Sequence, residues 1–252
     1  IRAGHLDDGT PLDIVSAFQS YGEWVAGRTT DEHRRDVVRN ACPGEGACGG
    51  MYTANTMASA IEALGMSLAN SSAQEAVSAQ KVDDCRRAGE AVLNLLRLDI
   101  KPRDIMTRKA FENAISVVIA LGGSTNAVIH LLARAGRVSV DLTLDDWDRC
   151  GRDVATIVDL MPAGKYLMEE FYYAGGLPVV LRHLAEAGML HADALTVSGT
   201  SIGDEVRDAQ NWNKDVIRPA DKALTASGGI AVLKGNLAPD GAVLKPSAAT
   251  PA

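Results

Sequence analysis

Residues 41–57 read Ala-Cys-Pro-Gly-Glu-Gly-Ala-Cys-Gly-Gly-Met-Tyr-Thr-Ala-Asn-Thr-Met and lead from a glycine-rich loop directly into a helical segment. A helix over residues 51–68 is predicted by apolar residues at helical spacing, namely Met57, Ile61, Leu64 and Leu68. We therefore expect Cys48 near a helix N-terminus, where unpaired amides and the positive end of the helix dipole favour thiolate over thiol. The two glycines that follow leave room beside the sulfur. Such a loop is typical of a site for a metal, a cluster or an anionic substrate.

The four cysteines do not establish a metal site by their spacing. Cys42 and Cys48 are separated by five residues, which matches neither the C-x-x-C spacing of zinc sites nor a complete four-cysteine cluster motif. Free cysteines are among the most buried residues, so a packing role for both stays open. Cys85 and Cys150 each stand alone in helical or polar surroundings, and we interpret them as ordinary residues.

Composition indicates a globular protein. Of the 252 residues, 46% are hydrophobic and 23% charged, which is enough to bury a core. The net charge of −7 argues against a nucleic-acid surface, which needs clustered Lys and Arg. There is no signal peptide and no apolar run approaching about 18 residues. We therefore expect a cytoplasmic protein that binds neither nucleic acid nor a membrane.

The first two-thirds of the sequence is mostly helical in pattern. Helices are predicted over residues 13–26, 30–40, 51–68, 81–98, 107–121, 124–135, 142–153 and, with interruptions, 166–188. The polar segment 70–79 is the expected flexible loop. Strand and turn patterns follow from about residue 192, at 194–197, 216–217, 229–233 and 242–245, with Asp240-Gly241 as a hairpin turn. The predicted fold is α/β, with a partial N-terminal α/β domain over 1–191 and the start of a β-rich domain over 192–252.

A second helix start follows Gly122-Gly123. Ser124 is expected to cap a helix that runs to Ala135, with Gly136 as its C-cap. Free amides over 124–126 can meet a substrate carboxylate, so Ser124 and Thr125 are candidate substrate-binding residues. A plain helix–turn–helix in which small residues allow close packing is the open alternative. His130, among apolar sequence neighbours, is predicted to be a buried histidine rather than a ligand.

The stretch 46–57, continued by Ala-Ile-Glu-Ala-Leu-Gly-Met-Ser-Leu over 60–68, closely resembles the dihydroxy-acid dehydratase family. Further stretches fit the same family in the same order: 101–105 (Lys-Pro-Arg-Asp-Ile), 109–114, 122–127 (Gly-Gly-Ser-Thr-Asn-Ala), 164–166, 195–199 and 235–242. The resemblance covers nearly the whole chain.

This resemblance implies an iron–sulfur enzyme that dehydrates a small 2,3-dihydroxy acid to a 2-keto acid. Similar enzymes hold a [2Fe-2S] or [4Fe-4S] cluster with three cysteines, and the third of these maps onto Cys48. The resemblance further implies Mg²⁺ beside the cluster, a homodimer, and an α/β domain followed by a β-barrel-like domain that supplies a serine base. In such enzymes a cluster iron without a cysteine ligand stabilises the departing hydroxide, while the base removes the proton from C2.

Several parts of that machinery are absent from the sequence. There is no Cys-Asp-Lys motif and no cysteine before Cys42, and the sequence stops at Ala252 without the serine of the C-terminal domain. One ligand cannot hold a cluster. We therefore expect an internal fragment, inactive alone, whose catalytic base lies beyond Ala252.

The substrate is left open between two branches of the superfamily. The Gly-Ala-Cys-Gly-Gly-Met-Tyr form around Cys48 is typical of the dihydroxy-acid dehydratases of branched-chain amino-acid biosynthesis. Residues 171–176, and 211–213 through Arg218-Pro219, look more like the sugar-acid (aldonate) dehydratases. Ala69 replaces the proline usual in the family, and the serine-rich segment after it is altered, so selectivity differs if that loop lines the site. A non-catalytic fragment is the third possibility.

Overall fold

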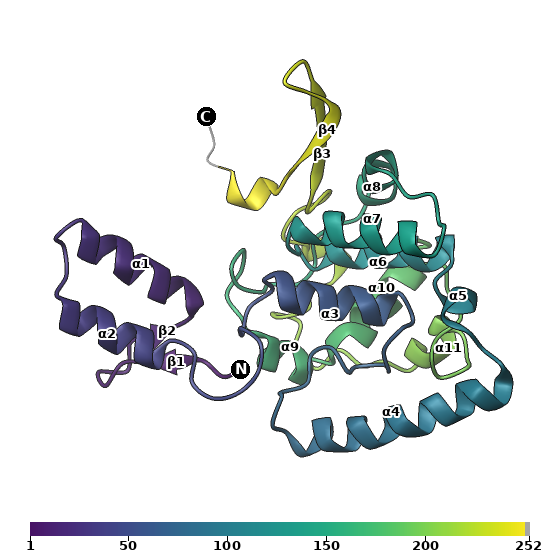
Figure 1. The fold of residues 1–252 in the computed structure, drawn as a ribbon, viewed down its shortest axis with the longest axis horizontal. Helices are drawn as coiled ribbons and strands as arrows, with labels where there is room; N and C mark the ends of the chain where they lie inside the picture. The colour runs from purple at the N-terminus through teal and green to yellow at the C-terminus, as the bar shows by residue number, and fades with distance from the viewer. Residues whose placement is uncertain (250–252) are drawn as a thin grey trace.

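The computed structural model describes residues 1–249, which form eleven α-helices and two small antiparallel sheets (Figure 1). The strands are β1 (Gly4–His5), β2 (Pro11–Leu12), β3 (Ala231–Gly235) and β4 (Ala238–Leu244). The helices are α1 (Ile14–Val25), α2 (Asp31–Asn40), α3 (Thr53–Ala63), α4 (Ala79–Leu98), α5 (Pro102–Ile105), α6 (Arg108–Ala120), α7 (Asn126–Arg137), α8 (Leu144–Gly151), α9 (Met168–Tyr173), α10 (Gly176–Glu186) and α11 (Ile202–Val206).

Helix α6 is the centre of the main core. Nearly every residue from Ala110 to Ala120 is buried, because α3, α8 and α10 all pack against this helix. A helix that is apolar all round is stable only when it is covered on every side. Its N-terminus is capped by Thr107, whose hydroxyl accepts a hydrogen bond from the Ala110 amide at 3.4 Å. The helix that leads from the glycine-rich loop, α3, thus rests directly on the most buried element.

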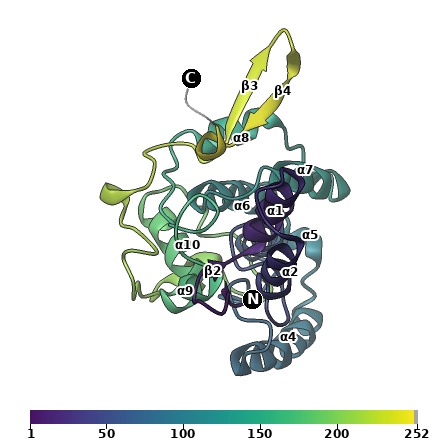
Figure 2. The same cartoon turned by 90° about the vertical axis from the view of Figure 1, so that its left-hand side faces the viewer.

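The other elements lie around this core. Helices α1 and α2 with β1 and β2 form a lobe with its own small core of Leu12, Val37 and Ala41 (Figure 1). The sequence allows either Thr29 or Thr30 to cap α2, and the structure has Thr30, whose hydroxyl accepts from the His33 amide at 3.1 Å. Helix α4 runs along one edge of the molecule, and the β3–β4 hairpin projects from the opposite edge (Figures 1 and 2).

The strand predictions are only partly confirmed. Residues 1–249 have mixed α and β structure, but they form no closed barrel. The segments predicted as strands at 194–197 and 216–217 make only isolated bridges, from Leu195 to Ser201 and from Val158 to Ile217. The hairpin turn is at Asn236 and Leu237, not at Asp240-Gly241, because Gly235 pairs with Ala238. The division at residue 192 stays a prediction.

Helix α7 differs in detail from its prediction. Thr125 rather than Ser124 occupies the N-cap position, and the helix continues through Gly136 to Arg137. His130 is exposed, so the prediction of a buried histidine is wrong. The buried positions of α7 are Ala127, Val128, Leu131 and Ala135, which share one face. His130 lies outside that stripe although its sequence neighbours are apolar.

Among the described residues, no helix is long and apolar enough to cross a membrane.

Candidate functional site

The backbone of Cys48 is fixed by the first turn of α3. The helix begins at Thr53, two residues later than predicted, with Tyr52 at the N-cap position. From that first turn, the Asn55 side chain donates through Nδ2 to the carbonyl of Cys48 at 2.5 Å and to that of Gly50 at 2.7 Å. Cys48 therefore lies beside the start of the helix, as expected, although it lies outside the helix itself.

A second segment, residues 161–168, holds the loop from its other side. The Met51 amide donates to the Met161 carbonyl at 2.6 Å, and the Met168 amide donates to the Gly49 carbonyl at 2.7 Å. Close packing explains Gly50, since a Cβ there would lie 2.9 Å from the Met161 oxygen and 2.7 Å from the Tyr52 ring. The chain on the C-terminal side of Cys48 is thus fixed by main-chain hydrogen bonds.

The thiol of Cys42 lies near that of Cys48. Burial raises the pKa of the Cys42 thiol, and the neighbouring Cys48 and Asp13 raise it further. Burial, with Asp13 and Cys48 as neighbours, also raises the pKa of Tyr52 to about 12. Both cysteines are half-buried and neither forms a disulfide. Within residues 1–249 no three His, Cys, Asp or Glu side chains come together in a way that could hold a metal ion.

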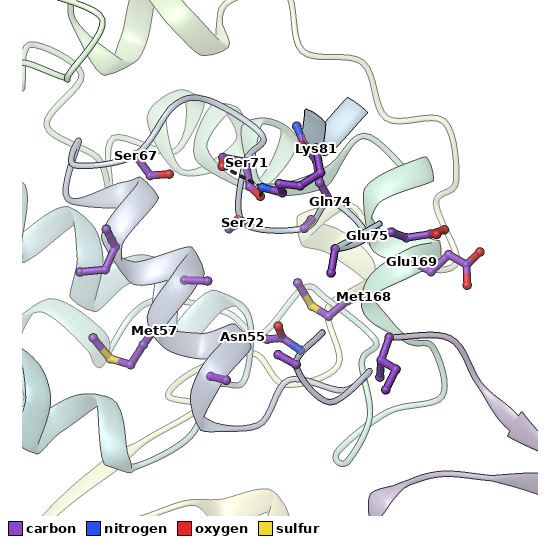
Figure 3. Close-up of a pocket in the computed structure, with 17 residues that line it drawn as sticks. Asn55, Met57, Ser67, Ser71, Ser72, Gln74, Glu75, Lys81, Met168 and Glu169 are labelled. Carbon is purple, nitrogen blue, oxygen red and sulfur yellow. Dashed lines mark hydrogen bonds between the residues drawn. The ribbon is translucent and has the colours of Figure 1, made fainter. Parts of the chain in front are cut away.

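A cavity of about 590 Å³ opens next to this loop (Figure 3). Ala47 and Asn55 connect it to the Cys48 loop, and one wall is the apolar face of α3. The other wall is formed by residues 71–76 of the segment between α3 and α4, so part of this stretch lines a cavity. The lining residues are Ile1, Ala47, Ala54, Asn55, Met57, Ala58, Ile61, Ser67, Ser71–Ala76, Lys81, Met168 and Glu169.

The cavity wall is held by a carboxylate that sequence reasoning missed. Glu62, in the last turn of α3, is only 3% exposed. Its two carboxylate oxygens accept from the main-chain amides of Asn70 at 2.6 Å and Ser72 at 2.8 Å. Burial raises the pKa of Glu62 to about 7, although hydrogen bonds from Ser72 and Asn70 oppose the rise. The partners lie eight and ten residues further along the chain, so no local pattern identifies them.

The turn at Ser124 lies on the opposite side of the α3 N-terminus. The Ser124 amide donates to the Thr56 hydroxyl at 3.0 Å, and the Ser124 and Thr53 hydroxyl oxygens are 3.3 Å apart. Lys245, which follows β4, donates to the Gly122 carbonyl at 2.6 Å, and burial lowers the pKa of this lysine. The structure therefore brings Ser124 and Thr125 close to the helix start beside Cys48, and it adds a lysine that the sequence did not indicate.

The other two cysteines lie away from the Cys48 loop. Cys85 is exposed on α4, and Cys150 lies at the end of α8.

Comparison with known proteins identifies relatives along the whole sequence. The family model described as "Dihydroxy-acid/6-phosphogluconate dehydratase N-terminal" matches residues 1–205, and its C-terminal counterpart matches residues 215–252. The chain is 51% identical over 247 residues to a dihydroxy-acid dehydratase of Francisella tularensis subsp. novicida, which covers 97% of this chain and 44% of that protein. It is 60% identical over 226 residues to an L-arabinonate dehydratase of Rhizobium leguminosarum bv. trifolii, covering 90% of this chain and 39% of the relative.

A plant relative extends the same similarity. The chloroplastic dihydroxy-acid dehydratase of Arabidopsis thaliana is 51% identical over 247 residues, which are 97% of this chain and 40% of that protein. The chain thus spans less than half the length of these relatives. Since the N-terminal family model alone covers 205 residues, most of the sequence, this chain belongs to the dihydroxy-acid/6-phosphogluconate dehydratase family.

Proposed function

We propose that this chain contributes to an iron–sulfur-dependent dehydratase that converts a 2,3-dihydroxy carboxylic acid into a 2-keto acid. The observation that carries this proposal is the position of Cys48. Its loop is fixed by Asn55 and by residues 161–168, and it lies at the edge of a cavity large enough for a small acid. Membership of the dehydratase family supports the same reaction class.

The side chains present fit a cluster only in part. The Cys48 thiol is the ligand that we propose for this chain, and its fixed backbone suits that role. Because residues 1–249 contain no group of three metal-binding side chains, the proposal requires further cysteines from outside this sequence. Mg²⁺ is likewise proposed from the family resemblance, with ligands outside these residues.

We propose that the chain's own polar groups bind the acid. Ser124 and Thr125 lie at the start of α7, and the Lys245 ammonium lies at the preceding glycine turn. The main-chain amides of Ser124 and Asn126 already donate to the hydroxyls of Thr56 and Ser124, so the proposed contact with the acid is made through the Ser124 and Thr125 hydroxyls. Neither residue is part of the cavity lining. The reaction removes the C3 hydroxyl and the C2 proton, and the resulting enol rearranges to the keto acid. The base that takes the C2 proton is not assigned to any residue of this sequence.

Two substrates are proposed. The first is the branched dihydroxy acid of branched-chain amino-acid biosynthesis, since the Francisella and Arabidopsis relatives are named dihydroxy-acid dehydratases. The alternative is a sugar acid, and the observation in its favour is the higher identity, 60% against 51%, to the L-arabinonate dehydratase. Anaerobic assays of both acids with the full-length protein distinguish the two.

The cluster proposal is tested by iron content and visible absorbance of the full-length protein prepared anaerobically. Cys48→Ser should lose the absorbance and most of the iron, whereas the matched variant Cys85→Ser, on the exposed face of α4, should keep both. Equal iron and equal spectra in all three proteins would leave Cys48 as a packing residue. Cytoplasmic location and a homodimer are further proposals, and size-exclusion chromatography with light scattering tests the dimer.

A further inference from the structure

The segment between α3 and α4 is unusually well fixed for a polar loop. Residues 70–72 are held from two sides by charged side chains of the flanking helices. From α3, Glu62 accepts two main-chain hydrogen bonds, from Asn70 and from Ser72. The two oxygens of the Glu62 carboxylate thus accept from two different main-chain amides, and this fixes the backbone on both sides of Ser71.

The second contact comes from α4 and fixes Ser71 itself. The Lys81 ammonium donates to the Ser71 carbonyl at 2.8 Å and lies 3.2 Å from the Ser71 hydroxyl (Figure 3). It also lies 3.2 Å from Asp84 Oδ2. The Ser71 hydroxyl donates to the same Asp84 oxygen at 2.6 Å. Asp84 is 5% exposed, so this network is largely shielded from water.

Asn70 makes the turn that leads into this segment. Its φ of 61° lies in the left-handed region, which Asn occupies more readily than most residues other than glycine. Its side chain packs on the start of α10, where a Cβ on Gly176 would lie 2.1 Å from Asn70 Oδ1. The hydrogen bonds to Glu62 and from Lys81 thus fix the main chain of residues 70–72.

The two walls of the cavity differ in chemistry. The α3 wall presents apolar side chains, including Met57 and Ile61, whereas the loop wall presents Ser72, Gln74 and Glu75. The carbon chain of an acid can cover the apolar wall. A branched alkyl end against the loop wall would remove water from polar groups without replacing their hydrogen bonds, whereas hydroxyl groups would replace them.

We propose that residues 71–76 select the acid by its distal end, favouring acids with hydroxyl groups beyond C3 over acids with a branched alkyl end, and that Glu62 is the positioning residue for this wall. The inference rests on the proposed dehydration, because it names the class of acid that the site takes. Of the two proposed substrates, it favours the sugar acid over the branched dihydroxy acid.

The test uses the full-length protein with two acids, L-arabinonate and 2,3-dihydroxy-3-methylbutanoate. Glu62→Gln should raise KM for the hydroxylated acid about tenfold, change kcat less than about threefold, and leave KM for the alkyl acid nearly unchanged. Gln74→Leu, which makes the wall more apolar without touching its supports, should shift the preference toward the alkyl acid. Glu186→Gln is the matched control, since it makes the same chemical change at an exposed residue of α10.

Binding of both acids is measured by calorimetry as well, so that the wall is tested even without turnover. If neither acid is dehydrated by the unmodified protein, the proposed function fails, and the dissociation constants still decide whether the wall prefers hydroxyl groups. The inference is overturned if the unmodified protein binds the alkyl acid more tightly, or if Glu62→Gln and Gln74→Leu change both acids equally. If Glu62→Gln does not fold, Gln74→Leu alone carries the decision.

Discussion

The buried carboxyl group of Glu62 should make the free energy of unfolding depend on pH between about 4.5 and 7, which is above the range in which exposed carboxylates titrate. Its pKa is raised from the ordinary 4.5 to about 7, mainly by burial and in smaller part by the nearby Glu205. At about 1.36 kcal/mol per pH unit, this rise corresponds to roughly 3 kcal/mol between the folded and unfolded states.

The sign follows from proton binding. Between pH 4.5 and about 7, folded Glu62 holds a proton that the unfolded chain has already released. Stability therefore falls as pH rises through this window, and the loss is complete above pH 7. Glu62→Gln cannot ionise, so this variant should lack that part of the slope. The amide group leaves one of the two main-chain donors without an acceptor, at a cost of about 1–3 kcal/mol.

The assay is urea unfolding of the unmodified protein, Glu62→Gln and the control Glu186→Gln at several pH values from 5 to 8. The unmodified protein and the control should lose roughly 3 kcal/mol more than Glu62→Gln across this range. Identical pH profiles for all three proteins would show that Glu62 is ionised at ordinary pH, and the account of its burial would then be wrong.

Three substitutions test other parts of the structure. Gly50→Ala forces a Cβ against the Met161 carbonyl and should cost about 1–3 kcal/mol, with faster alkylation of Cys48 in a timed thiol assay; unchanged alkylation would contradict the tight docking of this loop. Asp159→Ala removes the carboxylate that accepts from Arg218 at 2.6 Å, and chemical unfolding should show a loss of about 3 kcal/mol. Phe111→Ala empties a fully buried position in α6 and should lower the unfolding free energy by about 3–5 kcal/mol, whereas a loss under about 1 kcal/mol would place this residue outside the core.

Local sequence signals predicted the helices well because each signal describes a contact within a few residues. Thr30 caps α2 through an amide three residues ahead. The apolar spacing after residue 51 indicated a helix, but its first two members, Met57 and Ile61, line the cavity. The fully buried face of α3 carries small residues such as Thr56, Ala60 and Ala63. His130 shows where this reasoning fails. Its neighbours along the chain are apolar, yet burial in a helix follows residues three and four positions apart, and His130 does not share their face.

The hairpin turn shows competition between two local signals. Asp240-Gly241 is a turn sequence, but the Asn236-Leu237 pair closes the hairpin, so Asp240 and Gly241 lie within β4. The register is decided by pairing along the whole strand, from Ala231 with Leu244 to Gly235 with Ala238. A two-residue turn sequence such as Asp240-Gly241 carries no information about the contacts along the rest of the two strands.

The candidate site combines both kinds of information. Cys48 was identified from its own loop, and the structure adds what holds it, namely Asn55 from the next helix and a segment more than a hundred residues away. Glu62 reads in sequence as an ordinary acid near a helix end, where exposure is the usual state. It is buried because two amides of the cavity wall have no other acceptor, and the high pKa follows from that burial. Sequence patterns do not indicate the hydrogen bonds from the Asn70 and Ser72 amides to Glu62. These two bonds connect the shape of the cavity wall to a single titratable group. For this reason one substitution, Glu62→Gln, tests stability through its pH profile and selectivity through KM.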